Sequence, residues 1–219
     1  KHMHNPNNPA TSITHSQSSG LDALIALAQA QPLLPACDHF IFLRHGQTPR
    51  NVLKIFQSHD EPLSDLGWQQ AREAAAALAA EPIASIVTST TRRAFDTALT
   101  VAAPHQLAPI ESDALRERFF GDWLGTSSAQ LDWAATPPGG ESLAQFVART
   151  RAGLADSLQA PGPVLVIAHG GTLYVLAALL GVPLNPGLMG NAQPLRFTRQ
   201  GDDWAAQPLL AAGGDASLA

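Results

Sequence analysis

The chain has 219 residues, of which 45% are apolar and 14% charged, and its formal net charge is −5. This composition is globular, and the length suits one domain or two small ones. The negative charge argues against a basic surface for nucleic acid or anionic lipid, so the groups that hold an anionic substrate must be few and local. The single cysteine, Cys37, excludes an intrachain disulfide and a cysteine-rich metal site, and it favours a cytoplasmic protein.

Low-complexity segments lie at both ends of the chain. Residues 1–20, rich in Asn, Pro, Ser and Thr, predict a flexible tail, and the Ala- and Gly-rich residues 211–219 predict another. Leucines and alanines at helical spacing predict a short helix over 21–31, within an N-terminal helical extension at 21–37. No apolar run reaches the roughly 18–20 residues that a membrane span needs. Residues 38–210 are therefore predicted to form the main domain.

Strands and helices alternate through this domain. Continuous apolar runs, typical of strands buried on both faces, occur at 40–43, 83–88 and 164–168. Helical patterns occur at 64–80, at 92–103, after the capping-box residue Ser142, and at 172–180. Late edge strands are expected at 196–198 and 204–209, and a loop with one helical turn at 127–140. The pattern predicts an α/β fold with an open, mostly parallel sheet and helices on both faces.

Two of the predicted strands end in a histidine that glycine follows. His45 stands in Leu-Arg-His-Gly, and His169 stands in Ile-Ala-His-Gly-Gly. Ligands of open α/β sheets bind at the carboxyl ends of strands, so we expect the two histidines to face each other across one crevice. An imidazole with one unprotonated nitrogen is a competent nucleophile toward phosphorus. The pattern therefore favours phosphotransfer, with His45 as the nucleophile.

Phosphotransfer also needs cations for the phosphoryl oxygens and a proton for the leaving oxygen. Arg44 adjoins His45, and Arg92 and Arg93 open a predicted helix, where positive charge opposes the macrodipole and calls for another reason. Glu117 is flanked by two arginines. On the residues alone, Glu117 is either the proton donor or a member of a surface ion-pair cluster.

Six segments together resemble the histidine phosphatase superfamily, also called the phosphoglycerate mutase-like family, over roughly residues 40–180. They are LRHGQTPRN at 43–51, PLSDLG…QA at 62–71, S…RAFDTA at 89–98, LRE…FGDWLG at 115–125, GGES at 139–142, and HGG at 169–171. The third segment aligns Arg93, rather than Arg92, with the family's phosphate ligand. Two departures stand out. Residues 56–58 are Phe-Gln-Ser where many members have F-x-G, and the segment 58–62 that follows is one residue short; the 38-residue lead before the first strand is also longer than the family needs.

The resemblance implies a role for each matching residue. Its catalytic residues would be His45 as the phosphohistidine, Glu117 as the proton donor, and His169. The phosphate would be held by Arg44, Thr48, Asn51, Arg93, His169 and Gly170. The leaving group would contact Gln57, Ser58, Arg118, Phe119 and Trp123, and Trp133, Leu188 and Met189 would extend an apolar wall. The resemblance implies no metal and no other cofactor.

The segment before GGES decides among the members of this family. Only residues 126–138 separate the two motifs there, whereas cofactor-dependent mutases carry a long capping insertion. A short cap leaves water access, which favours a histidine acid-type phosphatase that acts on a small phosphate monoester. Arg118, at a position that can hold a substrate carboxylate, keeps a phosphoglycerate mutase open as the alternative. A non-catalytic phospho-ligand binding module is the third alternative, and a homodimer is left open.

Overall fold

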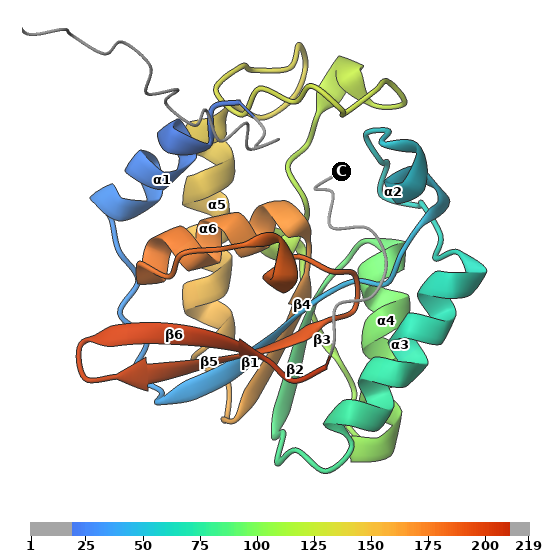
Figure 1. Cartoon of the computed structure of the whole chain (residues 1–219), viewed down its shortest axis with the longest axis vertical. Coiled ribbons are helices and arrows are strands. Elements are labelled where there is room, and N and C mark those ends of the chain that lie inside the picture. The colour runs from blue at the N-terminus through green and yellow to red at the C-terminus, as the bar shows by residue number, and fades with distance from the viewer. Residues whose placement is uncertain (1–18, 211–219) are drawn as a thin grey trace, which may run out of the picture.

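The computed structural model describes residues 19–210, so 1–18 of the predicted N-terminal tail (1–20) and the predicted tail at 211–219 lie outside it. The flexible-tail prediction is wrong for Ser19, which pairs with Asp132, and for Gly20, which caps the first helix. Within this range, six strands form one sheet in the order β3-β2-β4-β1-β5-β6 (Figure 1). The strands are β1 (His39–Arg44), β2 (Ser85–Ser89), β3 (Ile110–Ser112), β4 (Val164–Ala168), β5 (Pro194–Gln200) and β6 (Asp203–Pro208). Strands β1 to β4 are parallel to one another, while β5 is antiparallel to both β1 and β6. The predicted mostly parallel sheet is confirmed, but β5 lies inside it and only β6 is a late edge strand.

Helices cover both faces of the sheet. They are α1 (Leu21–Ala30), α2 (Pro49–Leu53), α3 (Asp65–Leu78), α4 (Arg92–Ala102), α5 (Leu143–Ser157) and α6 (Gly170–Leu180). Short 3-10 turns occur at Ala103–His105, Asp113–Leu115, Gly121–Trp123 and Pro186–Leu188. The capping box predicted at Ser142 is confirmed, because its hydroxyl accepts from the Gln145 amide and Gln145 bonds back. α6 begins directly after His169, two residues before the predicted start.

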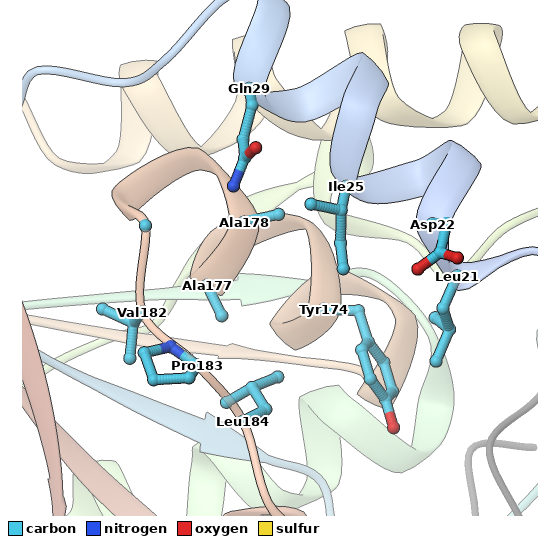
Figure 2. A pocket seen from close by; sticks show the side chains of 11 residues that line it. Leu21, Asp22, Ile25, Gln29, Tyr174, Ala177, Ala178, Val182, Pro183 and Leu184 are labelled. Carbon is cyan, nitrogen blue, oxygen red and sulfur yellow. The ribbon is translucent and has the colours of Figure 1, made fainter.

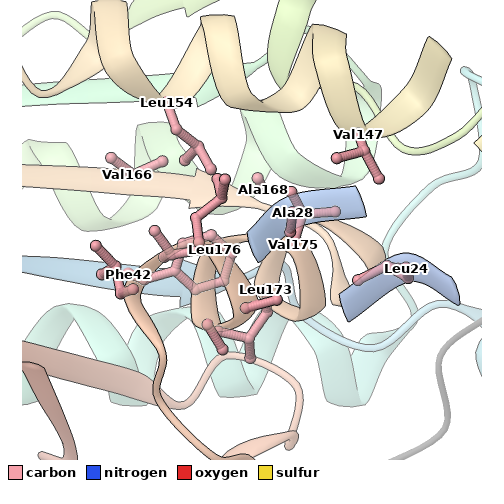
Figure 3. Packing of buried hydrophobic residues seen from close by; sticks show 14 of the residues in the cluster. Leu24, Ala28, Phe42, Val147, Leu154, Val166, Ala168, Leu173, Val175 and Leu176 are labelled. Carbon is pink, nitrogen blue, oxygen red and sulfur yellow. The ribbon is translucent and has the colours of Figure 1, made fainter. Parts of the chain in front are cut away.

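The strands in the middle of the sheet send alternate side chains to two apolar layers. Phe42 and Val166 contact the layer of α1, α5 and α6, as Figure 3 shows. Leu43 and Ile167 belong to the opposite layer with α3 and α4. Each such buried side chain contributes about 1.5–3 kcal/mol, so both layers hold the ends of β1 and β4 in place.

The loop at 127–140 differs from its prediction. It contains hydrogen-bonded turns, such as Leu131 N–H to the Ser128 carbonyl, and no helical turn near Leu131. Trp133 is 1% exposed and packs against Phe146 and Tyr174, so the expected pocket wall at Trp133 is wrong and the indole is part of the core. Among the described residues, no helix is long and apolar enough to cross a membrane.

Candidate active site

The two histidines meet at the carboxyl ends of neighbouring strands. Arg44 pairs with Ala168 across β1 and β4, and His45 and His169 are the next residues of the two segments. Their ring centroids lie 5.2 Å apart with the planes at 61°. His45 is 2% exposed and His169 is fully buried. The prediction that the two histidines lie face to face at the strand ends is therefore confirmed.

A hydrogen bond to the backbone determines which nitrogen of the His45 ring carries the proton. Nδ1 lies 2.7 Å from the Gly46 carbonyl oxygen, which only accepts, so Nδ1 carries the proton and Nε2 keeps its lone pair. Burial, followed by the positive charges of Arg93 and Arg44, lowers the pKa of His45 well below its ordinary value of 6.5. The ring is therefore a neutral imidazole with a nucleophilic Nε2.

Close backbone contacts fix the segment that carries His45. A Cβ on Gly46 would stand 2.5 Å from the Gly67 carbonyl oxygen, and a Cβ on Gly67 would overlap the Gln47 carbonyl oxygen. These close contacts explain why both positions are glycine. From the other side, the Ala192 amide donates to the carbonyls of Arg44 and His45, and Asn191 Nδ2 donates to the His45 carbonyl at 3.2 Å. Neither Asn191 nor Ala192 belongs to a motif, so no sequence pattern predicts these contacts.

The structure places Arg44 and Arg93 inside the molecule. Arg44 is 1% exposed and donates from Nη1 to the Met189 carbonyl at 2.8 Å. Arg93 is 2% exposed and donates to the Ser58 carbonyl at 2.7 Å. Arg92, in contrast, lies on the surface beside Asp96. Burial lowers the pKa of Arg93 to about 10, which still leaves the guanidinium charged at neutral pH.

His169 is held by hydroxyl groups at the end of β2. Its Nε2 lies 2.8 Å from Ser89 Oγ and 3.4 Å from Thr91 Oγ1. Burial and the nearby charge of Arg93 lower the pKa of His169 well below 6.5. Ser89 stood in a quoted motif without a role, and the structure assigns it the orientation of this ring. Gly170 follows as the first residue of α6, whose N-terminus lies next to His169 and favours an anion there.

Glu117 lies against the same helix end. Its Oε1 accepts from the Arg118 amide at 2.9 Å, and its Oε2 accepts from the Gly171 amide at 3.2 Å. Burial raises the pKa of Glu117 above 4.5, although these hydrogen bonds and the charges of Arg93 and Arg44 oppose the rise. Arg116 forms its ion pair with Asp113 instead. The surface ion-pair reading of Glu117 is therefore not supported.

Thr48 and Asn51 shape the loop beside His45. Thr48 Oγ1 accepts from the Asn51 amide at 3.1 Å and donates to Gln57 Oε1 at 2.6 Å. Asn51 Oδ1 accepts in turn from the Thr48 amide at 3.0 Å, which completes a capping box at the start of α2. These two residues thus hold each other, and a direct contact to phosphate stays a prediction.

The sequence of the chain matches the profile of the histidine phosphatase superfamily (branch 1) over residues 40–208. The chain belongs to this superfamily.

Glucosyl-3-phosphoglycerate phosphatase of Mycobacterium tuberculosis (strain ATCC 25618 / H37Rv) is 36% identical over 196 residues, covering 75% of this chain and 86% of that protein. The putative phosphoserine phosphatase 2 of Hydrogenobacter thermophilus is 32% identical over 154 residues, covering 63% and 76%. A solved structure of mycobacterial glucosyl-3-phosphoglycerate phosphatase with VO3 superposes with a TM-score of 0.67 at 32% identity, covering 81% of this chain and 100% of that one. The chain is thus an enzyme, a phosphatase of this superfamily.

The residues expected to contact the leaving group of this histidine phosphatase differ in their exposure to solvent. Arg118 is 2% exposed, and its guanidinium donates to the carbonyls of Glu141, Trp133 and Ala135 at 3.1, 3.0 and 2.8 Å. Because these donors bond to backbone carbonyls, the structure does not support the predicted hydrogen bond from Arg118 to a substrate carboxylate. Ser58 and Phe119 are exposed, whereas Trp123 is partly buried against Phe56. Ser58 and Phe119 remain candidates for contact with the leaving group.

A cleft of about 280 Å³ lies elsewhere in this histidine phosphatase, between α1, α6 and the loop that follows α6 (Figure 2). Its wall is mostly apolar and includes Ile25, Tyr174, Val182 and Leu184. None of the residues assigned to the phosphate or to catalysis lines it. The cleft is therefore separate from the predicted site residues at the strand ends.

Proposed function

We propose that the protein hydrolyses small phosphate monoesters by transferring the phosphoryl group first to Nε2 of His45 and then to water. The observation that carries this proposal is the hydrogen bond from His45 Nδ1 to the Gly46 carbonyl, in a buried ring on which the charges of Arg93 and Arg44 act. It leaves Nε2 neutral and nucleophilic where cations are present to receive a phosphate.

The first step forms a bond between phosphorus and His45 Nε2 and breaks the bond to the leaving oxygen. Arg44, Arg93 and His169 are proposed to stabilise the charge on the three equatorial oxygens. Protonated Glu117 gives its proton to the leaving oxygen, which departs as an alcohol. In the second step, Glu117 takes a proton from water while the water oxygen attacks phosphorus, which releases phosphate and restores His45.

Two opposite pKa shifts support the assignment to the histidine acid-type phosphatases. The lowered pKa of His45 keeps the nucleophile neutral at lower pH than an ordinary histidine, and the raised pKa of Glu117 keeps the donor protonated at higher pH than an ordinary glutamate. The two shifts thus widen the pH range in which a neutral His45 and a protonated Glu117 occur together.

For the substrate, a phosphoglycerate glucoside is the first candidate, because glucosyl-3-phosphoglycerate phosphatases are among the relatives that the chain covers most fully. The cofactor-dependent mutase alternative has weaker support, since Arg118 is engaged with backbone carbonyls. The single cysteine keeps the cytoplasm as our proposed compartment. A homodimer stays a prediction, for light scattering to check.

The direct test is phosphate release over a panel of monoesters. Glucosyl-3-phosphoglycerate, 3-phosphoglycerate, phosphoserine and p-nitrophenyl phosphate are each assayed with and without 2,3-bisphosphoglycerate. We expect phosphate from at least one alkyl ester without the bisphosphate, and the highest kcat/KM for glucosyl-3-phosphoglycerate. Conversion of 3- to 2-phosphoglycerate that requires the bisphosphate would support the mutase. Binding without any phosphate release by a folded sample would support the non-catalytic module.

A further inference from the structure

Arg149 of α5 binds the backbone of the segment that carries Glu117. Its Nη1 donates to the Ala114 carbonyl at 2.9 Å and to the Arg116 carbonyl at 3.0 Å, and its Nη2 reaches the Glu117 carbonyl at 3.3 Å. One guanidinium thus contacts three carbonyls within four consecutive residues. None of these bonds involves the Glu117 carboxylate, so they restrain where the residue lies without acting on its acidic group directly.

Glu141 extends the restraint to the other side of Glu117. It forms a bidentate ion pair with Arg149, in which Arg149 Nε donates to Glu141 Oε2 at 2.8 Å and Arg149 Nη2 donates to Glu141 Oε1 at 2.6 Å. Oε1 also accepts from the Phe119 amide at 2.8 Å. Although burial opposes it, these bonds lower the pKa of Glu141 below 4.5 and keep it ionised. Residues 114–119 are therefore fixed on both sides of Glu117 by one ion pair.

The ion pair also explains how an arginine can lie so near a proton donor. A guanidinium without a counter-ion beside Glu117 would favour its ionised form. The charges that act to lower the pKa of Glu117 are those of Arg93 and Arg44, whereas Arg149 has Glu141 as its own counter-ion. The side chains of Arg149 and Glu141 are 18% and 20% exposed, so solvent screens the pair only partly.

We propose that Arg149 and Glu141 are positioning residues for the phosphatase reaction, which hold the 114–119 backbone so that Glu117 presents its proton to the leaving oxygen. This inference rests on the proposed role of Glu117 as the general acid. It assigns a function to a helix residue outside every quoted motif and to the glutamate of GGES, which had no role in the proposed mechanism. Proton transfer requires heavy atoms within roughly 2.6–3.2 Å, so a small shift of this backbone is costly to the chemistry.

The test compares substrates with different leaving groups. Arg149→Met should lower kcat for an alkyl ester such as glycerol 3-phosphate about 10- to 100-fold, the loss expected for misplacement by about 1 Å. It should lower kcat for p-nitrophenyl phosphate much less, because nitrophenolate leaves without a proton. Arg149→Lys should recover part of the alkyl-ester activity. Arg151→Met is the matched control, since Arg151 lies on the same helix and donates to the carbonyls of Gln31 and Pro32. We expect it to leave the ratio of the two rates unchanged.

Glu117→Gln, alone and combined with Arg149→Met, separates the inference from the proposed function beneath it. If Arg149 acts through Glu117, Arg149→Met should change the rate ratio little in the Glu117→Gln background. A Glu117→Gln protein that loses both activities equally would refute the proposed donor. The positioning role of Arg149 would be refuted, with the proposed donor intact, by the following result. Glu117→Gln loses alkyl-ester activity selectively, but Arg149→Met either lowers both activities equally or has its full effect in the Glu117→Gln background. If Arg149→Met fails to fold by circular dichroism, Glu141→Gln serves in its place, with the same selective loss expected and an unselective loss overturning the inference.

Discussion

The carboxylate of Glu117 occupies the space that a side chain on Gly171 would fill. The Gly171 amide donates to Oε2 at 3.2 Å, and a Cβ on Gly171 would overlap Oε1. Gly171 is the second residue of α6, two positions after His169. Gly171 therefore has a steric purpose, because it lets the acidic group approach the end of the helix that follows His169.

Gly171→Ala should displace Glu117 and not the phosphate pocket. An added methyl at a helix position with free space stabilises by roughly 0.5–1 kcal/mol, but here it meets the carboxylate. We expect kcat for glycerol 3-phosphate to fall about 10- to 100-fold, with inhibition by inorganic phosphate nearly unchanged. Steady-state kinetics check both values. Full alkyl-ester activity in Gly171→Ala would show that the position of Glu117 does not matter.

Glu117→Gln should reveal proton donation through the leaving group. The amide keeps the size of the side chain but cannot supply the proton. We expect kcat for alkyl monoesters to fall about 10²–10⁴-fold and kcat for p-nitrophenyl phosphate to fall far less. Rates for phosphate esters of graded alcohol pKa measure this as the slope of log kcat. An unchanged slope in the variant would remove Glu117 from acid catalysis.

Much of this site could be predicted from the sequence because its central residues follow strands. Apolar runs mark β1 and β4, and parallel strands bring His45 and His169 to one edge whatever the chain between them does. Arg149 and Asn191 were not predicted, because each acts through a backbone carbonyl of a distant segment. Such contacts depend on tertiary packing and leave no local pattern.

The same limit explains where the structure departs from what the sequence led us to expect. Trp133 lies in a loop rich in prolines and glycines, which resembles an exposed segment, yet its indole packs under α5 and α6. Arg118 matches a position that can hold a substrate carboxylate, but its guanidinium donates to three carbonyls of neighbouring loops. The short strand β3 has two exposed residues among its three and carries no apolar run.

The pH dependence of the enzyme should reflect the two shifted groups. His45 must be neutral to attack, and its pKa is lowered, so the acidic limb of kcat/KM should lie below pH 6.5. Glu117 must be protonated to donate, and its pKa is raised, so the alkaline limb for an alkyl ester should lie above pH 4.5. Glu117→Gln should lose that alkaline limb. An acidic limb at or above pH 6.5 would mean that His45 titrates like an exposed histidine.

Chelation should leave the activity unchanged, because the proposed mechanism assigns the cationic work to Arg44, Arg93 and hydrogen-bond donors. The measurement is phosphate release after incubation with EDTA and removal of the chelator by gel filtration. We expect the same kcat as in the untreated enzyme. Loss of activity that one divalent ion restores would contradict the metal-free mechanism.

The central claim is a phosphoryl group on His45, and rapid quenching of the enzyme with ³²P-labelled substrate tests it most directly. The account predicts protein-bound label that survives base and is lost in acid, and that peptide mapping places on His45. His45→Ala should fold, carry no label and lose turnover about 10³-fold or more. Label that resists acid, label on another residue, or turnover at the wild-type rate by folded His45→Ala would contradict it.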